Sequence, residues 1–254
     1  GGSAFIKLAG TDFTGSLLVG HSTTGTLDAA TYNTGVGINA MDAITSADYN
    51  TCIGYQAGTL ITTSPQNTLI GRDTGSKITT SAGLNTFVGS GAGTYNYGSS
   101  NVGIGSHSVK SASGNGAGYG NSGCGASSLT AVTSGIFNAG LGYQSVNAVN
   151  TGDYNIGIGY TAGNNITSGS GNVVIGVADV SSATADDQFS LSDGEDGSVV
   201  WMTGDSSANV TVTGDLTITG DDLFMNTNTS GAALIGDGTN FNPVVISGDI
   251  SIAT

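Results

Sequence analysis

The chain has little of what most globular enzymes are built from. Its 254 residues include only 2 Pro, 2 Cys, 2 His and 1 Trp, and 4 Lys plus Arg stand against 18 Asp plus Glu. Because so few basic side chains are present to neutralise phosphates, we expect no nucleic-acid partner. No apolar run approaches the length of a membrane span, so we also expect no membrane insertion.

Glycine, in contrast, is abundant, and ten of the 44 glycines mark a repeat. A short block recurs with Gly in its fifth place and a small or medium apolar residue just before it. With the first residue of each block as position 0, the blocks start at Ser16, Asn33, Asn50, Asn67, Asn85, Asn101, Asn121, Asn138, Asn155 and Asn172. The spacing is mostly 17 residues and ranges from 16 to 20. A fixed period of this kind predicts a solenoid, in which each coil packs against the next.

The residue types within a block predict a short strand. β-Branched residues occupy +1 and +3, as in Thr51 and Ile53, and a strand places these two positions on one face. We therefore predict an all-β protein with a parallel β-solenoid of about ten coils, whose interior is formed by the +1 and +3 side chains. A weaker apolar position at +11, for example Ile44, predicts a second strand in each coil.

Two positions have specific backbone roles. Gly at +4 is expected to adopt a positive φ or to allow close approach of the next coil. Asn at position 0 suits a turn, and stacked Asn side chains predict an amide ladder along the solenoid. The residues chosen to represent this structural repeat are Asn50, Ile53, Gly54, Asn67, Ile70, Gly71, Asn155, Ile158 and Gly159.

Such a coil has a thin interior, and this predicts an oligomer. Two modest apolar side chains per coil bury too little area to offset the entropy of ordering seventeen residues. Position +2 alternates between Gly and large residues such as Phe87, which favours contact with neighbouring chains. Cys52, at +2, would then face another chain, whereas Cys124, at +3, would be a small core residue. Four coils separate them, so no disulfide is expected between them.

The pattern changes along the chain. We divide it into an N-terminal lead-in (1–15), the β-roll repeat domain (16–180), an acidic connector (181–208) and a β-rich stalk (209–254). In the stalk, VTVTGD at 210–215 is followed by LTITGD at 216–221, and strands this short need three chains around an axis to form a core. Residues 181–254 hold 11 acidic residues and no basic one. We expect salt or nonspecific divalent cations to stabilise this part by screening.

Few residues in the chain have the arrangement that catalysis or metal binding needs. His21 and His107 lie five repeats apart, too far to share a metal ion. Asp193, Glu195 and Asp196 favour a solvated acidic loop, with a calcium loop as the alternative. The Ser residues have no recurring His or Asp partner. We therefore expect no enzyme, no catalytic residue, no cofactor and no specific metal site.

Tyrosines give the better functional indication. Tyr55, Tyr143 and Tyr160 all occupy +5, and Tyr95 and Tyr97 belong to a coil whose +11 residue is Asn96. Exposed tyrosines stack on sugar rings, although aromatic rows in solenoids also cover neighbouring turns. We treat these five tyrosines as candidate receptor-binding residues.

Several segments carry a resemblance to known families. NTCIGYQAG at 50–58, YNIGIGYTAG at 154–163 and NTGVGINA at 33–40 resemble the head repeat of trimeric autotransporter adhesins. That resemblance implies a left-handed parallel β-roll and association of three chains. VTVTGDLTITGDDLFM and GTNFNPVVISGDISIAT are similar to stretches of bacteriophage tail fibres, in which repeat heads join slender triple-stranded shafts.

Together, these resemblances imply a structural tail fibre of a phage virion. Its expected partners are two further copies of itself, other virion tail proteins, and a glycan or protein of the host surface. A bacterial trimeric surface adhesin or extracellular filament subunit is the main alternative. A fibre enzyme that cuts surface polysaccharide and an ice-binding surface built from Thr rows are further alternatives.

Overall fold

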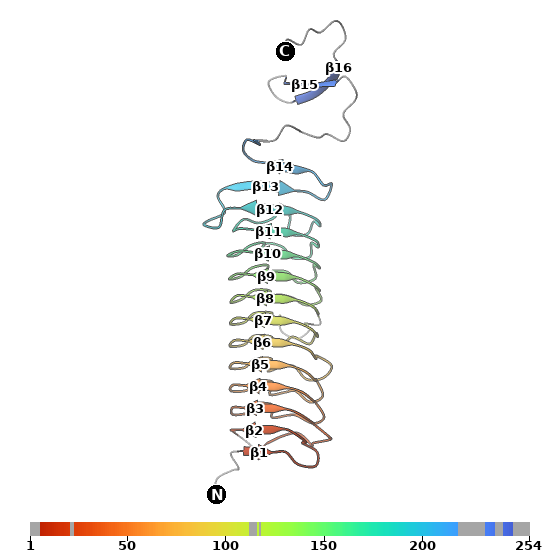
Figure 1. Ribbon diagram of the computed structural model, residues 1–254, viewed down its shortest axis with the longest axis vertical. Coiled ribbons are helices and arrows are strands. Elements are labelled where there is room, and N and C mark those ends of the chain that lie inside the picture. Colours follow the sequence, from red (N-terminus) through yellow and green to blue (C-terminus); the bar gives the residue numbers. More distant parts are fainter. Residues whose placement is uncertain are drawn as a thin grey trace. The chain divides into compact units, whose positions relative to one another are not determined.

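The computed structural model describes residues 6–20, 23–111, 116 and 118–217, and the strands at 232–236 and 241–245. All regular elements in these residues are β-strands. The chain separates into two units, Gly1–Gly214 and Asp215–Thr254. The first unit holds a single sheet whose strands follow one another in chain order (Figure 1).

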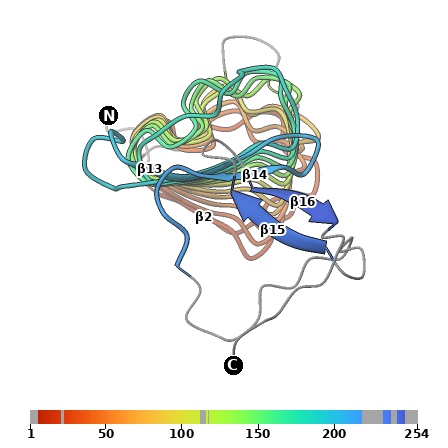
Figure 2. The ribbon, with the colours of Figure 1, turned by 90° about the horizontal axis from the view of Figure 1, so that it is seen from above.

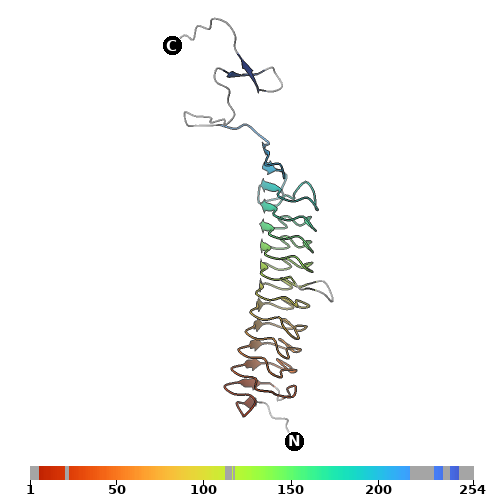
Figure 3. The same ribbon diagram turned by 90° about the vertical axis from the view of Figure 1, so that its right-hand side faces the viewer.

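The centre of this sheet is parallel, with one strand from each coil. Its parallel strands are β2 (Leu17–Val19), β3 (Thr34–Val36), β4 (Thr51–Ile53), β5 (Thr68–Ile70), β6 (Thr86–Val88), β7 (Val102–Ile104), β8 (Ser122–Cys124), β9 (Ala139–Leu141), β10 (Ile156–Ile158), β11 (Val173–Ile175) and β12 (Phe189–Ser192). Equivalent positions pair, so that Thr51 lies opposite Thr68 and Ile53 opposite Ile70. The predicted parallel β-solenoid with coils of about 17 residues is confirmed, and its strands stack along one side of the unit (Figure 3).

Antiparallel strands close both ends of the stack. β1 (Ile6–Leu8) pairs with β2. At the other end, β13 (Val200–Gly204) pairs with β12, and β14 (Val210–Val212) pairs with β13. The VTVTGD segment therefore begins with the last strand of the solenoid sheet, within the segment that we had assigned to the stalk.

The predicted second strand of each coil is wrong. The +11 residues are buried, as expected of core positions, and Ile44, Ile61 and Ile78 have no exposed surface. However, they lie in irregular backbone that follows a run of turns, outside any strand. Each coil thus consists of one three-residue strand and a longer segment of turns and irregular backbone that leads to the next strand. We call this segment the long return; Figure 2 shows the coils along the stack.

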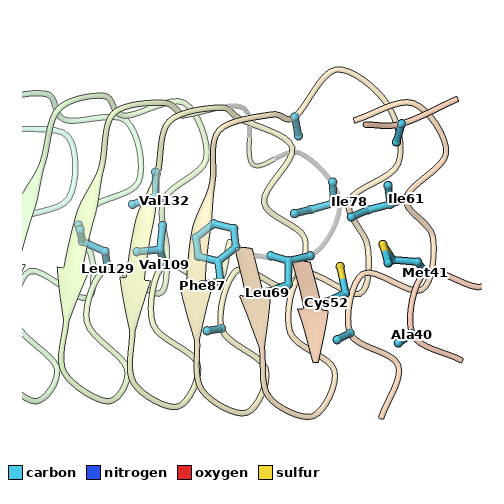
Figure 4. Packing of buried hydrophobic residues seen from close by; sticks show 14 of the residues in the cluster. Ala40, Met41, Cys52, Ile61, Leu69, Ile78, Phe87, Val109, Leu129 and Val132 are labelled. Atoms are coloured by element: carbon cyan, nitrogen blue, oxygen red, sulfur yellow. The ribbon is translucent and has the colours of Figure 1, made fainter. Parts of the chain in front are cut away.

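The prediction for the interior face of the strand is also wrong. Ile53, Ile70 and Ile158, at +3, are 39%, 37% and 41% exposed, whereas the +2 residues between +1 and +3 are buried. The core contains the +2 side chains together with those at +7, +8 and +11 (Figure 4). Sequence alone did not reveal the face because +2 is often Gly, which carries no hydrophobic signal although it lies inside.

The alternation between Gly and large residues at +2 is related to the residue type at +8 of the same coil. From the coil at Asn33 to the coil at Asn138, position +8 is Gly where +2 carries a side chain, as in Leu69 or Phe87, and +8 is large where +2 is Gly, as in Gly103 with Val109. The coils at Ser16, Asn155 and Asn172 depart from this pattern. A Cβ at Gly93, the +8 partner of Phe87, would lie 2.1 Å from the Phe87 ring. In these seven coils the two positions share one volume, and the large side chain comes from one of them or the other.

The predicted asparagine ladder is confirmed. The backbone N–H of Asn50 donates to Oδ1 of Asn33 (3.0 Å), and Nδ2 of Asn50 donates to the same oxygen (3.1 Å). The same pair of bonds links Asn67 to Asn50 at 3.0 and 3.1 Å. These asparagines are fully buried, so the ladder satisfies backbone and side-chain groups that have no access to water.

Gly at +4 has both properties that the sequence predicts. Gly54 has a φ of +137°, and a Cβ there would lie 2.4 Å from the backbone oxygen of Gly71 in the next coil. Gly142 and Gly159 are related in the same way, with a distance of 2.2 Å. A side chain at this position would therefore be strained in its own backbone and would push two coils apart.

The parallel stack continues one coil beyond residue 180, where we had placed the start of an acidic connector. Gln188 takes the place of Asn, since its backbone N–H and Nε2 donate to Oδ1 of Asn172 at 2.9 and 3.0 Å. Ser192 takes the place of Gly at +4. The spacing signal was lost because both marker residues are replaced in this coil.

The second unit contains a two-stranded antiparallel sheet of β15 (Ala232–Gly236) and β16 (Phe241–Val245). The remaining residues after 217, which include LTITGD from its third residue on, lie outside the described residues. The triple-stranded stalk therefore remains a prediction.

Candidate functional site

The solenoid presents an apolar surface on the outside of its sheet. We define the outward strand face as the +1 and +3 side chains of β3 to β11. These positions are mostly Thr, Val, Ile and Leu, and their +3 members are partly exposed in each of these strands. Leu141 is the most exposed of the large ones, at 54%. Parallel sheets are normally covered on both faces, so this face has the character of a surface that another layer covers.

A shallow hollow of about 230 Å³ lies on the outward strand face between β7 and β10. Small side chains at Ser122, Cys124 and Ala139 form its floor, and larger ones at Val102 and Ile158 border it. The hollow follows directly from residue size, because the +1 and +3 positions of β8 and β9 carry fewer atoms than those of their neighbours. Its surface is almost wholly apolar, and the Ser122 hydroxyl and the Cys124 thiol are the polar side-chain groups that line it.

The two cysteines are placed opposite to our expectation. Cys52, at +2, is buried in the core, and burial raises the pKa of its thiol far above the usual range. Cys124, at +3, is exposed on the outward strand face. Both thiols are free, as the distance along the stack predicts.

The structure brings together only two of the candidate tyrosines. Tyr143 and Tyr160 stack with ring centroids 5.5 Å apart and planes inclined by 10°. Tyr55 has the same coil position but belongs to a coil about 24 Å away along the stack. Tyr55, Tyr143 and Tyr160 are 47% to 57% exposed. Tyr95 and Tyr97 are half-buried and lie on the long return of their coil.

A second aromatic row was not anticipated from the sequence. It occupies −1, directly before the ladder Asn, and comprises Tyr32, Tyr49, Phe137 and Tyr154. Tyr32 stacks on Tyr49 at 5.1 Å, and Phe137 stacks on Tyr154 at 5.4 Å. Each has a φ between 56° and 59°. The recurring pairs Tyr-Asn and Phe-Asn were the signal that would have revealed it.

The two aromatic rows flank the outward strand face. Position −1 lies two residues before the strand begins, and +5 lies two residues after it ends, as Tyr49 and Tyr55 do around β4. Stacked, half-exposed rings at the spacing of the coils form a repeating surface. Such rings can pack against the flat face of a sugar, with no chemical step required of the protein.

The acidic loop that follows β12 is organised by one carboxylate. Oδ1 of Asp193 accepts hydrogen bonds from the backbone N–H groups of Glu195, Asp196 and Gly197, and Oδ2 accepts one from Val199 at 2.7 Å. The bonds from Gly197 and Val199 contribute most to lowering the pKa of Asp193 to about 2. This carboxylate therefore holds its own loop, as a turn-forming Asp does.

Within the described part of the chain, no three His, Cys, Asp or Glu side chains come together as a metal site would require. The described residues also include no apolar helix of the length that crosses a bilayer. His21 lies outside the described residues.

Comparisons of the chain with protein families, with curated proteins and with solved structures found no match in any of the three.

Proposed function

We propose that the chain is a non-catalytic structural fibre protein of a phage virion, which assembles as a homotrimer and contacts the host cell surface. The observation that carries the proposal is the outward strand face. It extends over nine successive coils, and Ile53, Ile104 and Ile158 are representative of its exposed residues. Isolated exposed apolar side chains are ordinary on a monomer, but a row that continues over successive strands is typical of an interaction surface.

We propose that two further copies of the chain cover the outward strand face. Three such sheets would pack their apolar sides around a common axis, and each coil would then lie between two apolar layers. The choice of three copies rests on the resemblance of the repeats to trimeric adhesin heads. A rod of this kind suits a fibre, because its length is set by the number of coils.

Contact with the host is assigned to the aromatic rows. Tyr49, Tyr154 and Tyr160 are each 57% exposed, and they flank the proposed interface. Amphipathic rings of this kind bind large, flat ligand surfaces at low entropic cost. A surface glycan is the partner that such rings fit best.

Assembly is tested by the mass of the protein in dilute solution, with Ile53→Glu and Leu60→Glu as a matched pair. Both residues belong to one coil, and their exposures are 39% and 38%, but only Ile53 lies on the outward strand face. We expect wild type and Leu60→Glu to have the mass of three chains and Ile53→Glu to dissociate. A wild-type protein with the mass of one folded chain contradicts the trimer.

The location in a virion is tested by labelling with an antibody raised against the solenoid. We expect gold label on thin appendages of phage particles in electron micrographs of the source culture. Label confined to bacterial envelopes would instead support the surface-adhesin alternative and contradict the phage assignment.

A further inference from the structure

The positive charge of this acidic chain is concentrated in one place. Only four Lys and Arg residues stand against 18 Asp and Glu. Three of these four, Arg72, Lys77 and Lys110, line a single hollow of about 330 Å³, together with His107. The hollow lies on the long return of the coils and adjoins the +5 row, since Arg72 occupies +5 in the coil after that of Tyr55.

The repeat explains how residues far apart in the sequence meet there. Arg72 and Lys77 occupy +5 and +10 of one coil, and Tyr95 lies at +10 of the next. The following coil contributes His107 at +6 and Lys110 at +9. Because the coils stack in register, residues at similar positions of successive coils lie next to one another on the same side of the solenoid.

A glycine in the wall of the hollow allows the His107 ring to approach closely. In the +6 row, Gly91 stands between Asp73 and His107. A Cβ at Gly91 would lie 2.9 Å from Cδ2 of His107. The His107 ring therefore lies over Gly91, in the space that a side chain there would need, and both residues line the hollow.

The basic side chains exceed the local acidic ones. Arg72 pairs with Asp73, with Nη1 and Oδ2 2.5 Å apart, and its Nη2 donates to Oγ of Ser90 at 3.1 Å. Asp73 is the single carboxylate that lines the hollow. Among the described residues, neither Lys77 nor Lys110 has a carboxylate within ion-pair distance. The hollow thus carries unneutralised positive charge on a chain of net charge −14.

We propose that this hollow binds an anionic group, a carboxylate, sulfate or phosphate, carried by an acidic saccharide. The lysine ammonium groups and the Arg72 guanidinium supply charge-assisted hydrogen bonds to the anion. Hydroxyl and amide groups of Thr94 and Gln56, and the ring of Tyr95, supply the neutral contacts that a sugar needs. The volume has room for roughly one or two sugar rings.

A short acidic saccharide fits this site better than a long polyanion does. Only Lys7 and 17 acidic residues remain in the rest of the chain, so a nucleic acid that extended beyond the hollow would meet repulsion. The inference rests on the proposed function in one respect: a fibre that contacts cell surfaces meets acidic polysaccharides there.

The site is tested by calorimetric titration of the full chain at low ionic strength with four probes. These are tetragalacturonate, a sulfated heparin tetrasaccharide, neutral maltotetraose and inorganic phosphate. We expect at least one acidic tetrasaccharide to bind and maltotetraose not to bind. Lys77→Gln combined with Lys110→Gln is expected to weaken binding by about tenfold or more, because two charge-assisted bonds are lost.

Lys7→Gln is the matched control for Lys77→Gln and Lys110→Gln made singly, since it removes one positive charge from β1, outside the hollow. Equal weakening by Lys7→Gln and by either hollow lysine would overturn the site in favour of a general charge effect. Tyr95→Ala is expected to weaken binding of the acidic tetrasaccharide and to leave the affinity for phosphate unchanged. Phosphate affinity equal to that of both acidic tetrasaccharides would contradict the saccharide assignment. Circular dichroism confirms that each variant is folded.

The outcomes separate this inference from the proposed function. Absence of binding by every acidic probe, in a protein that still labels virion fibres, would overturn the site alone. Binding that depends on Lys77 and Lys110, in a protein found elsewhere than on virions, would support the site and contradict the virion assignment.

Discussion

The ring of Phe87 occupies the space that a side chain at Gly93 would need, six residues later in the same coil. A Cβ at Gly93 would lie 2.1 Å from Cδ2 and 2.3 Å from Cε2 of Phe87. In the coil that begins at Asn138 the relationship is reversed, since a Cβ at Gly140 would lie 2.9 Å from Cγ2 of Val146. The interior of such a coil therefore accepts one large side chain, and either of two positions can supply it.

This relationship predicts a rescue. Gly93→Val alone is expected to lower the free energy of unfolding by about 3 kcal/mol, because it overpacks the coil. Combined with Phe87→Gly it reproduces the Gly103 and Val109 pair, and most of the loss is expected to be recovered. Urea denaturation of both single variants and the double variant measures the coupling.

Gly10→Val serves as the control for that cycle, since a Cβ at Gly10 has nothing within 4 Å. It is expected to leave stability almost unchanged. Additive losses from Phe87→Gly and Gly93→Val would contradict the shared volume.

The asparagine ladder predicts a large cost for removing one rung. Oδ1 of Asn67 accepts from both the backbone N–H and Nδ2 of Asn85, at 3.2 and 3.1 Å. Asn67→Leu leaves the buried backbone N–H of Asn85 without an acceptor. Nδ2 of Asn85, in contrast, still donates to the carbonyl oxygens of Ala82 and Gly98, at 3.2 and 3.0 Å. We therefore expect a loss of about 2 kcal/mol or more. Asn147→Ala, at a half-buried turn, is the comparison and is expected to cost far less. Thermal unfolding followed by circular dichroism measures both, and equal effects would show that the ladder does not carry the stability assigned to it.

The different burial of the two cysteines predicts different rates of thiol labelling. Cys52 is buried within the coil, so iodoacetamide is expected to modify it only after unfolding. Cys124 lies on the outward strand face and is expected to react in the dissociated Ile53→Glu variant but to be protected in the trimer. Mass spectrometry of the labelled peptides measures the extent of modification at both cysteines. Rapid modification of Cys124 in assembled wild type would place the interface elsewhere.

The loop at Asp193 predicts a local response to acid. Its pKa is lowered from 3.8 to about 2 because the ionised form accepts several backbone N–H groups. The stabilisation is complete above the ordinary value of 3.8 and is lost as the pH falls towards 2. Hydrogen exchange at Gly197 and Val199 is therefore expected to lose protection between pH 4 and pH 2 relative to the core.

Asp193→Asn is the control for the acid response, because an amide neither titrates in this range nor carries the charge. It is expected to show weaker protection at neutral pH and no change on acidification. Protection at Gly197 that persists unchanged to pH 2 in wild type would show that the carboxylate does not hold the loop.

Part of this architecture could be predicted from sequence for a simple physical reason. Gly54 and Asn67 have roles that only one residue type performs well, a positive φ with close backbone approach and a repeating amide bond. Invariant residues at a fixed period therefore revealed the coil and its stacking.

The face of the strand could not be predicted in the same way. Ile53 on the outside and Leu69 on the inside are equally apolar, and Gly103 inside carries no signal at all. Periodicity separates two faces of a strand but does not say which is inside when both are apolar. The basic hollow was missed because Arg72, Lys77 and Lys110 come together through stacking of neighbouring coils, although each is isolated in the sequence.

The asparagine ladder also has an evolutionary consequence. From Asn50 to Asn172 the backbone N–H of each rung donates to Oδ1 of the rung before it, and Nδ2 does so too except at Asn101 and Asn121. Rungs that make both bonds, such as Asn67 and Asn155, are therefore chemically interchangeable. An in-frame duplication or loss of one repeat would leave every remaining rung satisfied and would change the length of the stack by about 4.8 Å. Reach can therefore be adjusted by unequal recombination within the gene, in steps of one coil, without any change to the chemistry of folding.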